Sequence, residues 1–342
     1  MNLGIDLGTS RVVIYSPGQG IVLDEPAVIA VNVTDGHVVA CGAEAEQMLG
    51  RTPPSIRAVQ PLQNGVIAEY ELAEQMLRQF LHRVCSNRVT KPCVAVSIAQ
   101  EVTEVEQRSF IEAVVSAGAR RVTLVPETVA AAIGAGLDVS LPKGQMVVNM
   151  GGGTTDVAVL TLRGIAVASS MREAGQAMDE AIQRYMRSQH GLLIGATMAE
   201  QVKIAIGGVL PRPEPLTMAV KGRDALTGLP HSVEVTSLEL CAPLQETMDA
   251  IIGQIQRVLE ITPPELAGDI MCDHIWLTGG LAQLYGLAQR IKDATGVPCR
   301  VASKPAHCVA VGAGMALQYA SSFSEVYDLG DYAYHLSDTV TN

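Results

Sequence analysis

LGIDLGTSRVVIY, at residues 3–15, returns later in the chain as MVVNMGGGTTDVAVL, at residues 146–160. Each copy consists of an apolar run rich in β-branched residues, a short turn rich in glycine and threonine, and a second apolar run. Two such runs around a glycine turn are typical of a β-hairpin. The repeat therefore predicts two hairpins, each of which opens one domain.

The turns of the two hairpins predict a binding site for phosphate groups. Glycine lets the backbone approach an anion closely, and consecutive N–H groups and hydroxyls donate hydrogen bonds to phosphate oxygens. A Rossmann or Walker loop leads from a strand directly into a helix, whereas a second strand follows here. The alternative is a β-rich protein whose glycine turns only close hairpins, but the pairing of the two copies favours phosphate.

Length and composition favour two domains and exclude several classes of protein. The chain has 342 residues, of which 48% are apolar, and single cores stop growing at about 250–300 residues. Seven cysteines without C-x-x-C spacing predict a reducing compartment rather than disulfides or zinc. The formal charge of −11 would repel nucleic acid, so we predict no nucleic-acid partner. We expect neither a secretion signal nor a membrane-spanning helix.

Helices and strands alternate in the rest of the chain, which is typical of α/β layers. Thr103 and Glu106 predict a helix that starts with a capping box and ends near Gly118. The other predicted helices cover residues 72–84, 127–134, 178–187, 198–206 and 244–259, and short strands are predicted at 122–125 and 216–221. The helix at 127–134 is made mostly of small residues, so we expect it to pack closely at a domain junction.

A third glycine turn follows the predicted strand at residues 275–278. It contains Gly279 and Gly280, and we expect a helix to begin near Ala282. The N-terminus of a helix favours negative charge. This turn is therefore a candidate to carry the nucleoside of a bound nucleotide.

Three glycine turns in this order resemble the superfamily of actin, sugar kinases and heat-shock chaperone ATPases. Within it, the chain resembles the MreB family of bacterial actins. Segments outside the turns carry this closer resemblance, among them GIVLDEP at 20–26, AAAIGAG at 130–136 and TPPEL at 262–266. The resemblance covers residues 1 to about 320. It implies an α/β, actin-like ATPase fold with two lobes, each a core of sheet and helices plus a smaller subdomain, and a nucleotide cleft between them.

The resemblance also implies the boundaries of the parts. The core of lobe I (IA) covers 1–32, 66–142 and 316–330, and its small subdomain (IB) covers 33–65. The core of lobe II (IIA) covers 143–180 and 244–315, and its subdomain (IIB) covers 181–243. Residues 331–342 form a tail, which either docks on the body or a partner or is frayed.

ATP and Mg²⁺ are the cofactors that the resemblance implies. The first phosphate loop consists of Gly8, Thr9, Ser10 and Arg11. The second consists of Gly151, Gly152, Gly153, Thr154 and Thr155, with Gly175 nearby. The nucleoside is contacted by Glu200 and Lys203, and the adenosine turn consists of Gly279, Gly280, Leu281 and Ala282. Asp6 and Asn149 approach the metal through water. Glu127 and Thr154 position the attacking water.

Three of these assignments have simpler alternatives. Glu127 taken alone reads as an acid at a helix N-terminus, where the helix dipole favours it. Glu200 and Lys203 could form an exposed ion pair three residues apart on one helix. Arg11 could point to solvent.

The chain departs from the family pattern around the cleft. Asn149 stands where the family usually has Asp, and Arg11 stands where it usually has Asn. Leu281 replaces a third glycine, Thr128 replaces a proline after Glu127, and Ala174 with Gln176 replaces a Gly and an Asp. Asparagine attracts Mg²⁺ less than aspartate does and is a poorer proton acceptor. We therefore expect a weak ATPase that binds ATP but hydrolyses it slowly, while Arg11 could pair with phosphate.

A cytoskeletal filament that organises cell-wall synthesis and rod shape is the function implied. The implied partners are further copies of the chain, in paired protofilaments, and membrane proteins of the MreC, MreD and RodZ kind. The location is cytoplasmic, with binding to the inner face of the membrane left open, because the candidate loop at 85–91 offers only Val89 as a large aliphatic residue beside Arg88 and Lys91. A small-molecule kinase or a chaperone-type ATPase on the same fold is the alternative, but no motif supplies a second substrate pocket or a peptide-binding domain.

Overall fold

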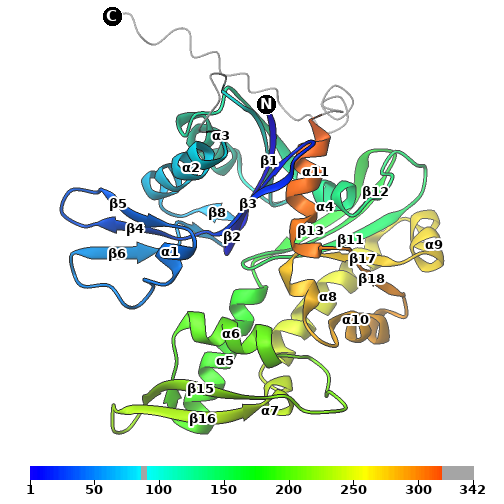
Figure 1. Ribbon diagram of the computed structural model, residues 1–342. Helices are drawn as coiled ribbons and strands as arrows, with labels where there is room; N and C mark the ends of the chain where they lie inside the picture. Colours follow the sequence, from blue (N-terminus) through cyan, green and yellow to red (C-terminus); the bar gives the residue numbers. More distant parts are fainter. Residues whose placement is uncertain (86–90, 318–342) are drawn as a thin grey trace, which may run out of the picture.

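The computed structural model describes residues 1–85 and 91–317 and places them in two lobes, each built on a five-stranded sheet (Figure 1). In lobe I the strand order is β10-β9-β1-β2-β3. These strands are β1 (Asn2–Leu7), β2 (Arg11–Ser16), β3 (Gly20–Pro26), β9 (Cys93–Ile98) and β10 (Arg121–Pro126). The first three pair antiparallel, whereas β9 and β10 run parallel to β1. Helices α2 (Tyr70–Cys85) and α3 (Glu104–Ser116) share an apolar core with this sheet.

The sheet of lobe II repeats this pattern. Its order is β13-β12-β11-β17-β18, with an antiparallel meander of three strands followed by two parallel strands. The strands are β11 (Gln145–Met150), β12 (Thr155–Thr161), β13 (Gly164–Met171), β17 (Ile275–Thr278) and β18 (Cys299–Val301), accompanied by α8 (Gln245–Ile261), α9 (Pro264–Cys272) and α10 (Leu287–Thr295). Both predicted hairpins are confirmed as β1–β2 and β11–β12, and the duplication extends to the whole sheet.

Each lobe carries a second, smaller sheet. In lobe I it contains β4 (Ile29–Asn32), β5 (Val38–Cys41) and β6 (Ile56–Val59), beside α1 (Ala43–Glu46) and the short pair β7 (Leu62–Gln63) and β8 (Val66–Ile67). In lobe II it contains β14 (Leu192–Leu193), β15 (Thr217–Asp224) and β16 (Pro230–Thr236), near α5 (Gly175–His190), α6 (Ala196–Ile206) and α7 (Ser237–Cys241). Because β4 pairs in the small sheet, that sheet begins at Ile29, before the predicted boundary at residue 33. The boundaries of the four parts otherwise stay a prediction.

Most local predictions are confirmed, and one is wrong. Thr103 and Glu106 form the predicted capping box at the start of α3. The helix after the third glycine turn does not begin at Ala282. Residues Gly280–Gln283 form a single 3-10 turn, η1, and α10 begins only at Leu287, after Gly286 in the left-handed conformation (φ 82°). A residue of that conformation interrupts a right-handed helix, which delays its start.

Helices α4 (Glu127–Gly134) and α11 (Cys308–Ala316) lie against each other between the two large sheets (Figure 1). The chain passes from lobe I to lobe II through α4, and it returns through the 3-10 segment η2 (Pro305–His307) into α11. Their small side chains share one apolar cluster with residues from both sheets. A Cβ added at Gly134 would lie 1.9 Å from the carbonyl oxygen of Cys308, and one at Gly312 would lie 1.8 Å from that of Ala130. The predicted close packing at a domain junction is thus present.

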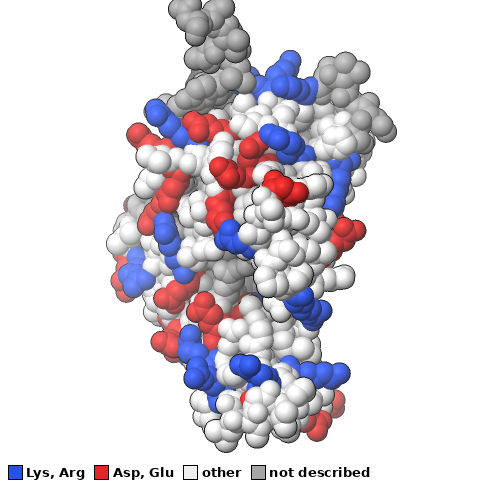
Figure 2. Space-filling view, turned by 90° about the vertical axis from the view of Figure 1, so that its left-hand side faces the viewer, with Lys and Arg blue, Asp and Glu red and all other residues white. Residues whose placement is uncertain are grey.

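The surface carries charges of both signs. On the face shown in Figure 2, acidic side chains lie over both halves of the molecule, with basic side chains between them. Among residues 1–85 and 91–317, no helix is long and apolar enough to cross a membrane. Most of the candidate membrane loop at 85–91 and the whole predicted tail at 331–342 lie outside the described residues.

We predict that Gly312→Ala lowers the free energy of unfolding by about 1–3 kcal/mol, because the added methyl group would overlap the Ala130 carbonyl and force α4 and α11 apart. Chemical denaturation of the purified protein measures this loss. The matched control is Gly253→Ala in α8, where a Cβ meets nothing within 4 Å; this change should be neutral or should stabilise by up to about 1 kcal/mol. Equal effects of the two substitutions would contradict the assignment of a close helix contact.

Candidate functional site

The three glycine turns meet at one cavity of about 510 Å³ between the lobes. Seventeen of the nineteen residues predicted for the site line it: Asp6, Gly8, Thr9, Ser10, Arg11, Glu127, Asn149, Gly151, Gly152, Gly153, Thr154, Gly175, Glu200, Lys203, Gly279, Gly280 and Leu281. The other two, Thr155 and Ala282, are buried behind the wall. The Thr155 hydroxyl donates to the carbonyl of Glu173 (2.8 Å), which turns it away from the cavity toward the segment before α5.

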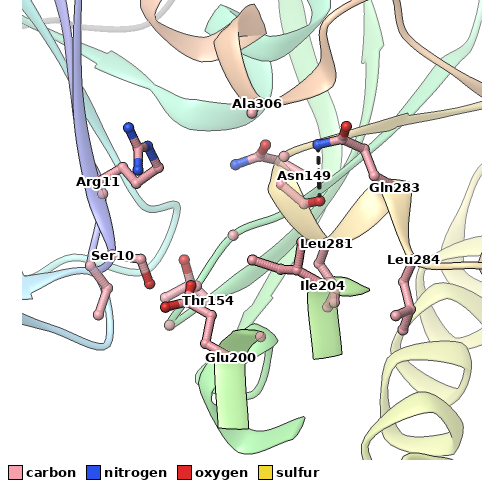
Figure 3. A pocket seen from close by; sticks show the side chains of 18 of the residues that line it. Ser10, Arg11, Asn149, Thr154, Glu200, Ile204, Leu281, Gln283, Leu284 and Ala306 are labelled. Atoms are coloured by element: carbon pink, nitrogen blue, oxygen red, sulfur yellow. Dashed lines mark hydrogen bonds between the residues drawn. The ribbon is translucent and has the colours of Figure 1, made fainter. Parts of the chain in front are cut away.

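The tips of the two hairpins touch each other. A Cβ at Gly152 would lie 2.1 Å from Ser10 Oγ, and one at Gly153 would lie 2.5 Å from Thr9 Oγ1. Figure 3 shows Ser10 and Thr154 on the same side of the cavity, each from its own turn. Only glycine leaves room for this contact. The two turns, one from each lobe, can therefore contact the same ligand.

Asp6, at the end of β1, is a half-buried carboxyl group at the cavity. Ser97 Oγ donates to its Oδ1 at 3.2 Å. Burial nevertheless raises the pKa of Asp6 to about 7, the Ser97 hydrogen bond opposes this shift, and the negative charge of Asp24 adds to it. The side chain is therefore one whose charge a nearby cation would stabilise.

Glu127 and Asn149 form a hydrogen-bonded pair on the floor of the cavity. Asn149 Nδ2 donates to Glu127 Oε2 at 2.9 Å, and Thr278 Oγ1 donates to Asn149 Oδ1 at 3.1 Å. The threonine therefore fixes which way the amide faces, since only the carbonyl oxygen accepts. Burial raises the pKa of Glu127 well above its usual value, with further contributions from Asp156 and Asp6, while the Asn149 hydrogen bond lowers it.

Arg11 does not point freely into solvent, although its side chain is 48% exposed. Its Nε donates to Asp24 Oδ1 at 2.7 Å, and His307 Nε2 lies 3.0 Å from Asp24 Oδ2. Burial opposes the charge of Asp24, but the hydrogen bonds to Arg11 and His307 outweigh it and lower the pKa of Asp24. Arg11 is thus half-exposed and paired with Asp24, and contact between Arg11 and a phosphate stays a prediction.

Lys203 and Glu200 both line the cavity, yet they do not pair with each other as an exposed ion pair would. The Lys203 ammonium is buried, and it donates to Asp179 Oδ2 (2.8 Å) and to the carbonyl of Gly175 (2.9 Å). Two of its three N–H donors are thereby held by the protein. Contact of Lys203 and Glu200 with a nucleoside stays a prediction.

The end of the cavity near the third turn is apolar and was only partly predicted. Ile204 projects here from α6, and Leu281 and Leu284 project from η1 and its C-terminal cap (Figure 3). The Arg212 guanidinium lies 4.0 Å from the centre of the Tyr285 ring. A pocket of this size, with apolar walls and a few converging polar groups, is typical of a small-molecule site. The sequence signal was an apolar residue, Ile204, that breaks the polar face of α6.

Comparison with known proteins identifies the chain. The family model described as MreB/Mbl protein matches residues 1–325. The chain belongs to the MreB/Mbl family. It is 42% identical over 318 residues to the cell shape-determining protein Mbl of Bacillus cereus, covering 93% of this chain and 96% of the relative. It is 44% identical over 323 residues to the cell shape-determining protein MreB of Escherichia coli, covering 93% of each.

Solved structures agree with this membership of the MreB/Mbl family. The crystal structure of MreB5 of Spiroplasma citri bound to AMPPNP has a TM-score of 0.87 and 34% identity, covering 94% of this chain and 97% of that one. The same protein bound to ADP has a TM-score of 0.88. A MamK double helical filament has a TM-score of 0.78 at 20% identity, which supports the fold alone. The predicted actin-like fold is thereby confirmed.

We predict that Asp6 makes the stability of the ligand-free protein depend on pH. Its pKa is about 7 in the folded chain, against an ordinary 3.8, so the folded state binds more protons between these values. In a buffer without nucleotide or Mg²⁺, this contribution is present below pH 4 and is lost as the pH rises to about 7. Asp6→Asn should remove a dependence of at most about 4 kcal/mol. Unfolding curves at pH 5, 6, 7 and 8 test this; parallel curves for wild type and variant would contradict it.

Proposed function

We propose that this chain binds ATP with Mg²⁺ in the cleft, assembles into filaments and acts in determining cell shape. The observation that carries the proposal is the contact between the two glycine turns at one cavity, Gly152 against Ser10 and Gly153 against Thr9. Membership of the MreB/Mbl family supports it, since relatives are named for cell shape and MreB5 of Spiroplasma citri has been solved with AMPPNP and with ADP.

In this proposal the two turns hold the phosphates from opposite lobes. Backbone N–H groups and hydroxyls of Gly8–Arg11 and Gly151–Thr154 donate to phosphate oxygens. The apolar end around Ile204 and Tyr285 takes the base, and Glu200 faces the sugar. Thr155 supports the second turn from behind rather than contacting the ligand, in keeping with its hydrogen bond to Glu173.

Mg²⁺ fits the chemistry of the cavity floor. Magnesium is usually held by one or two carboxylates together with phosphate oxygens and water. Asp6 supplies a half-buried carboxyl whose charge is opposed by desolvation and by Asp24, so a divalent cation would stabilise its charged form. Asn149 would act through water, because its amide already bonds to Glu127 and Thr278.

Glu127 and Thr154 would position the attacking water, and Asn149 would slow the reaction. Glu127 is held by the Asn149 amide, and its raised pKa reduces the fraction that can accept a proton. An aspartate at 149 would bring a second negative charge to the metal. The activity proposed is therefore a weak ATPase linked to assembly.

The proposed partners are other copies of the chain, in paired protofilaments, and wall-synthesis membrane proteins of the MreC, MreD and RodZ kind. The proposed location is the cytoplasm, with the inner face of the membrane as a further site of action. A kinase or chaperone on the same fold is the alternative. The match of the family model over residues 1–325 favours the filament, because it extends well beyond the nucleotide turns.

We predict that wild-type protein forms ordered filaments with ATP and Mg²⁺ and forms none without nucleotide, as seen by electron microscopy. Gly152→Ala should abolish both ATP binding and filaments, because the new Cβ would lie 2.1 Å from Ser10 Oγ and separate the two turns. Gly195→Ala is the control, since its Cβ would lie in open space and outside the cavity. Filaments of the Gly152→Ala protein at wild-type levels would refute the proposal that the two turns hold the phosphates together.

We predict that Asn149→Asp increases the rate of phosphate release from ATP by about tenfold or more. The aspartate restores a charge next to the metal and a proton acceptor, and tenfold corresponds to about 1.4 kcal/mol of barrier. A coupled phosphate assay with saturating ATP and Mg²⁺ measures the rate for both proteins. No gain on restoring aspartate would count against a role for Asn149 in slow turnover.

A further inference from the structure

A buried ion pair lies behind the second glycine turn. Lys203 on α6 and Asp179 on α5 are 2.8 Å apart, with 10% and 11% of their side chains exposed. Lys203 reaches the cavity, whereas Asp179 does not line it. Any effect of Asp179 on a ligand in the cavity would therefore pass through Lys203.

Backbone hydrogen bonds connect this pair to the turn itself. Lys203 Nζ donates to the carbonyl of Gly175, the first residue of α5. The N–H of Gly175 donates to Gly151 O at 3.2 Å, and the N–H of Gln176 donates to Gly152 O at 2.8 Å. A Cβ at Gly175 would lie 3.1 Å from Lys203 Nζ and 3.3 Å from Gly151 O, so these groups are packed tightly. A continuous path therefore runs from Asp179 through Lys203 and Gly175 to the second turn.

The pair is poorly explained as a source of stability. Taking both charges out of water costs about as much as their attraction returns. Burial raises the pKa of Asp179 to about 6 even though Lys203 opposes the shift. Its Oδ1 is buried and has no hydrogen-bond partner among the described residues. Lys203 is thus what holds this carboxylate, and the carboxylate in turn fixes the direction of the ammonium.

We propose that Lys203 and Asp179 are positioning residues for the second phosphate turn, which they hold in place through the Gly175 carbonyl. This inference rests on the proposed binding of ATP. It predicts that loss of the pair weakens the binding of ligands that have phosphates and leaves the binding of the nucleoside unchanged. A lysine that contacted only the base and sugar would affect both kinds of ligand equally.

The test measures Kd for ATP and for adenosine, by competition with a fluorescent ATP analogue in the presence of Mg²⁺. Asp179→Asn should raise the Kd for ATP about tenfold, which is about 1.4 kcal/mol. It should change the Kd for adenosine less than twofold. Lys203→Met should do the same, and the double variant should be no weaker than the worse single one. Ile204→Ala is the matched control on the same helix: Ile204 lines the cavity and carries no charge, so its loss should weaken the binding of ATP and of adenosine by the same factor.

The Asp179→Asn variant distinguishes a role in positioning the turn from a purely electrostatic effect of the Asp179 charge on ATP. Removing a negative charge near the phosphates should tighten ATP if only long-range electrostatics acted, whereas a misplaced turn should weaken it. Wild-type or tighter ATP binding by this variant would overturn the inference. So would an equal loss of ATP and adenosine in Lys203→Met.

A further variant covers the case in which a single change prevents folding. Breaking a buried pair leaves an uncompensated charge, whereas replacing both members by apolar residues is often tolerated. Lys203→Met combined with Asp179→Leu should fold, as judged by thermal unfolding, and should show the same selective loss of ATP. Wild-type ATP affinity in this double variant would refute the inference. A wild-type protein that binds neither ligand would instead overturn the proposed function.

Discussion

The contact between two glycine turns is the constraint on which the rest of the structure depends. Gly152 and Gly153 touch the hydroxyls of Ser10 and Thr9, and there is no room for a side chain between them. Each turn joins two antiparallel strands in the middle of its sheet, so the sheet fixes where the tip points. The repetition of the whole five-stranded pattern in both lobes brings the two tips together from opposite sides.

The chemistry of the cavity follows from burying acids at this junction. Asp6 and Glu127 are held in an environment that favours their neutral forms, and Asn149 stands between Glu127 and Thr278 as an uncharged link. The Asn149 amide donates a hydrogen bond to the Glu127 carboxyl group without adding a charge to the cavity floor. A cavity floor of this kind would gain most from a ligand that brings positive charge, such as a divalent metal ion.

Local patterns predicted the features that depend on neighbours in sequence. The hairpins, the capping box at Thr103, the small-residue helix α4 and most cavity residues follow from periodicity, turn chemistry and family motifs. The partners of Arg11 and Lys203 could not be predicted, because Arg11 meets Asp24 and His307, and Lys203 meets Asp179, only after folding. The start of α10 was misplaced because a left-handed Gly286 has the same sequence signature as any loop glycine.

The crossing of α4 and α11 sets how the two lobes can move. Their contact includes alanines and the close approaches of Gly134 and Gly312 to backbone carbonyls, beside Val129, Ile133 and Val309. Within residues 1–85 and 91–317, the chain passes between the two large sheets next to α4 and again next to α11. A joint made of short side chains can pivot without forcing rotamer changes, whereas interlocked side chains would have to separate first. A change in the angle between the two lobes at this crossing would therefore displace the outer sheets more than it displaces the crossing itself.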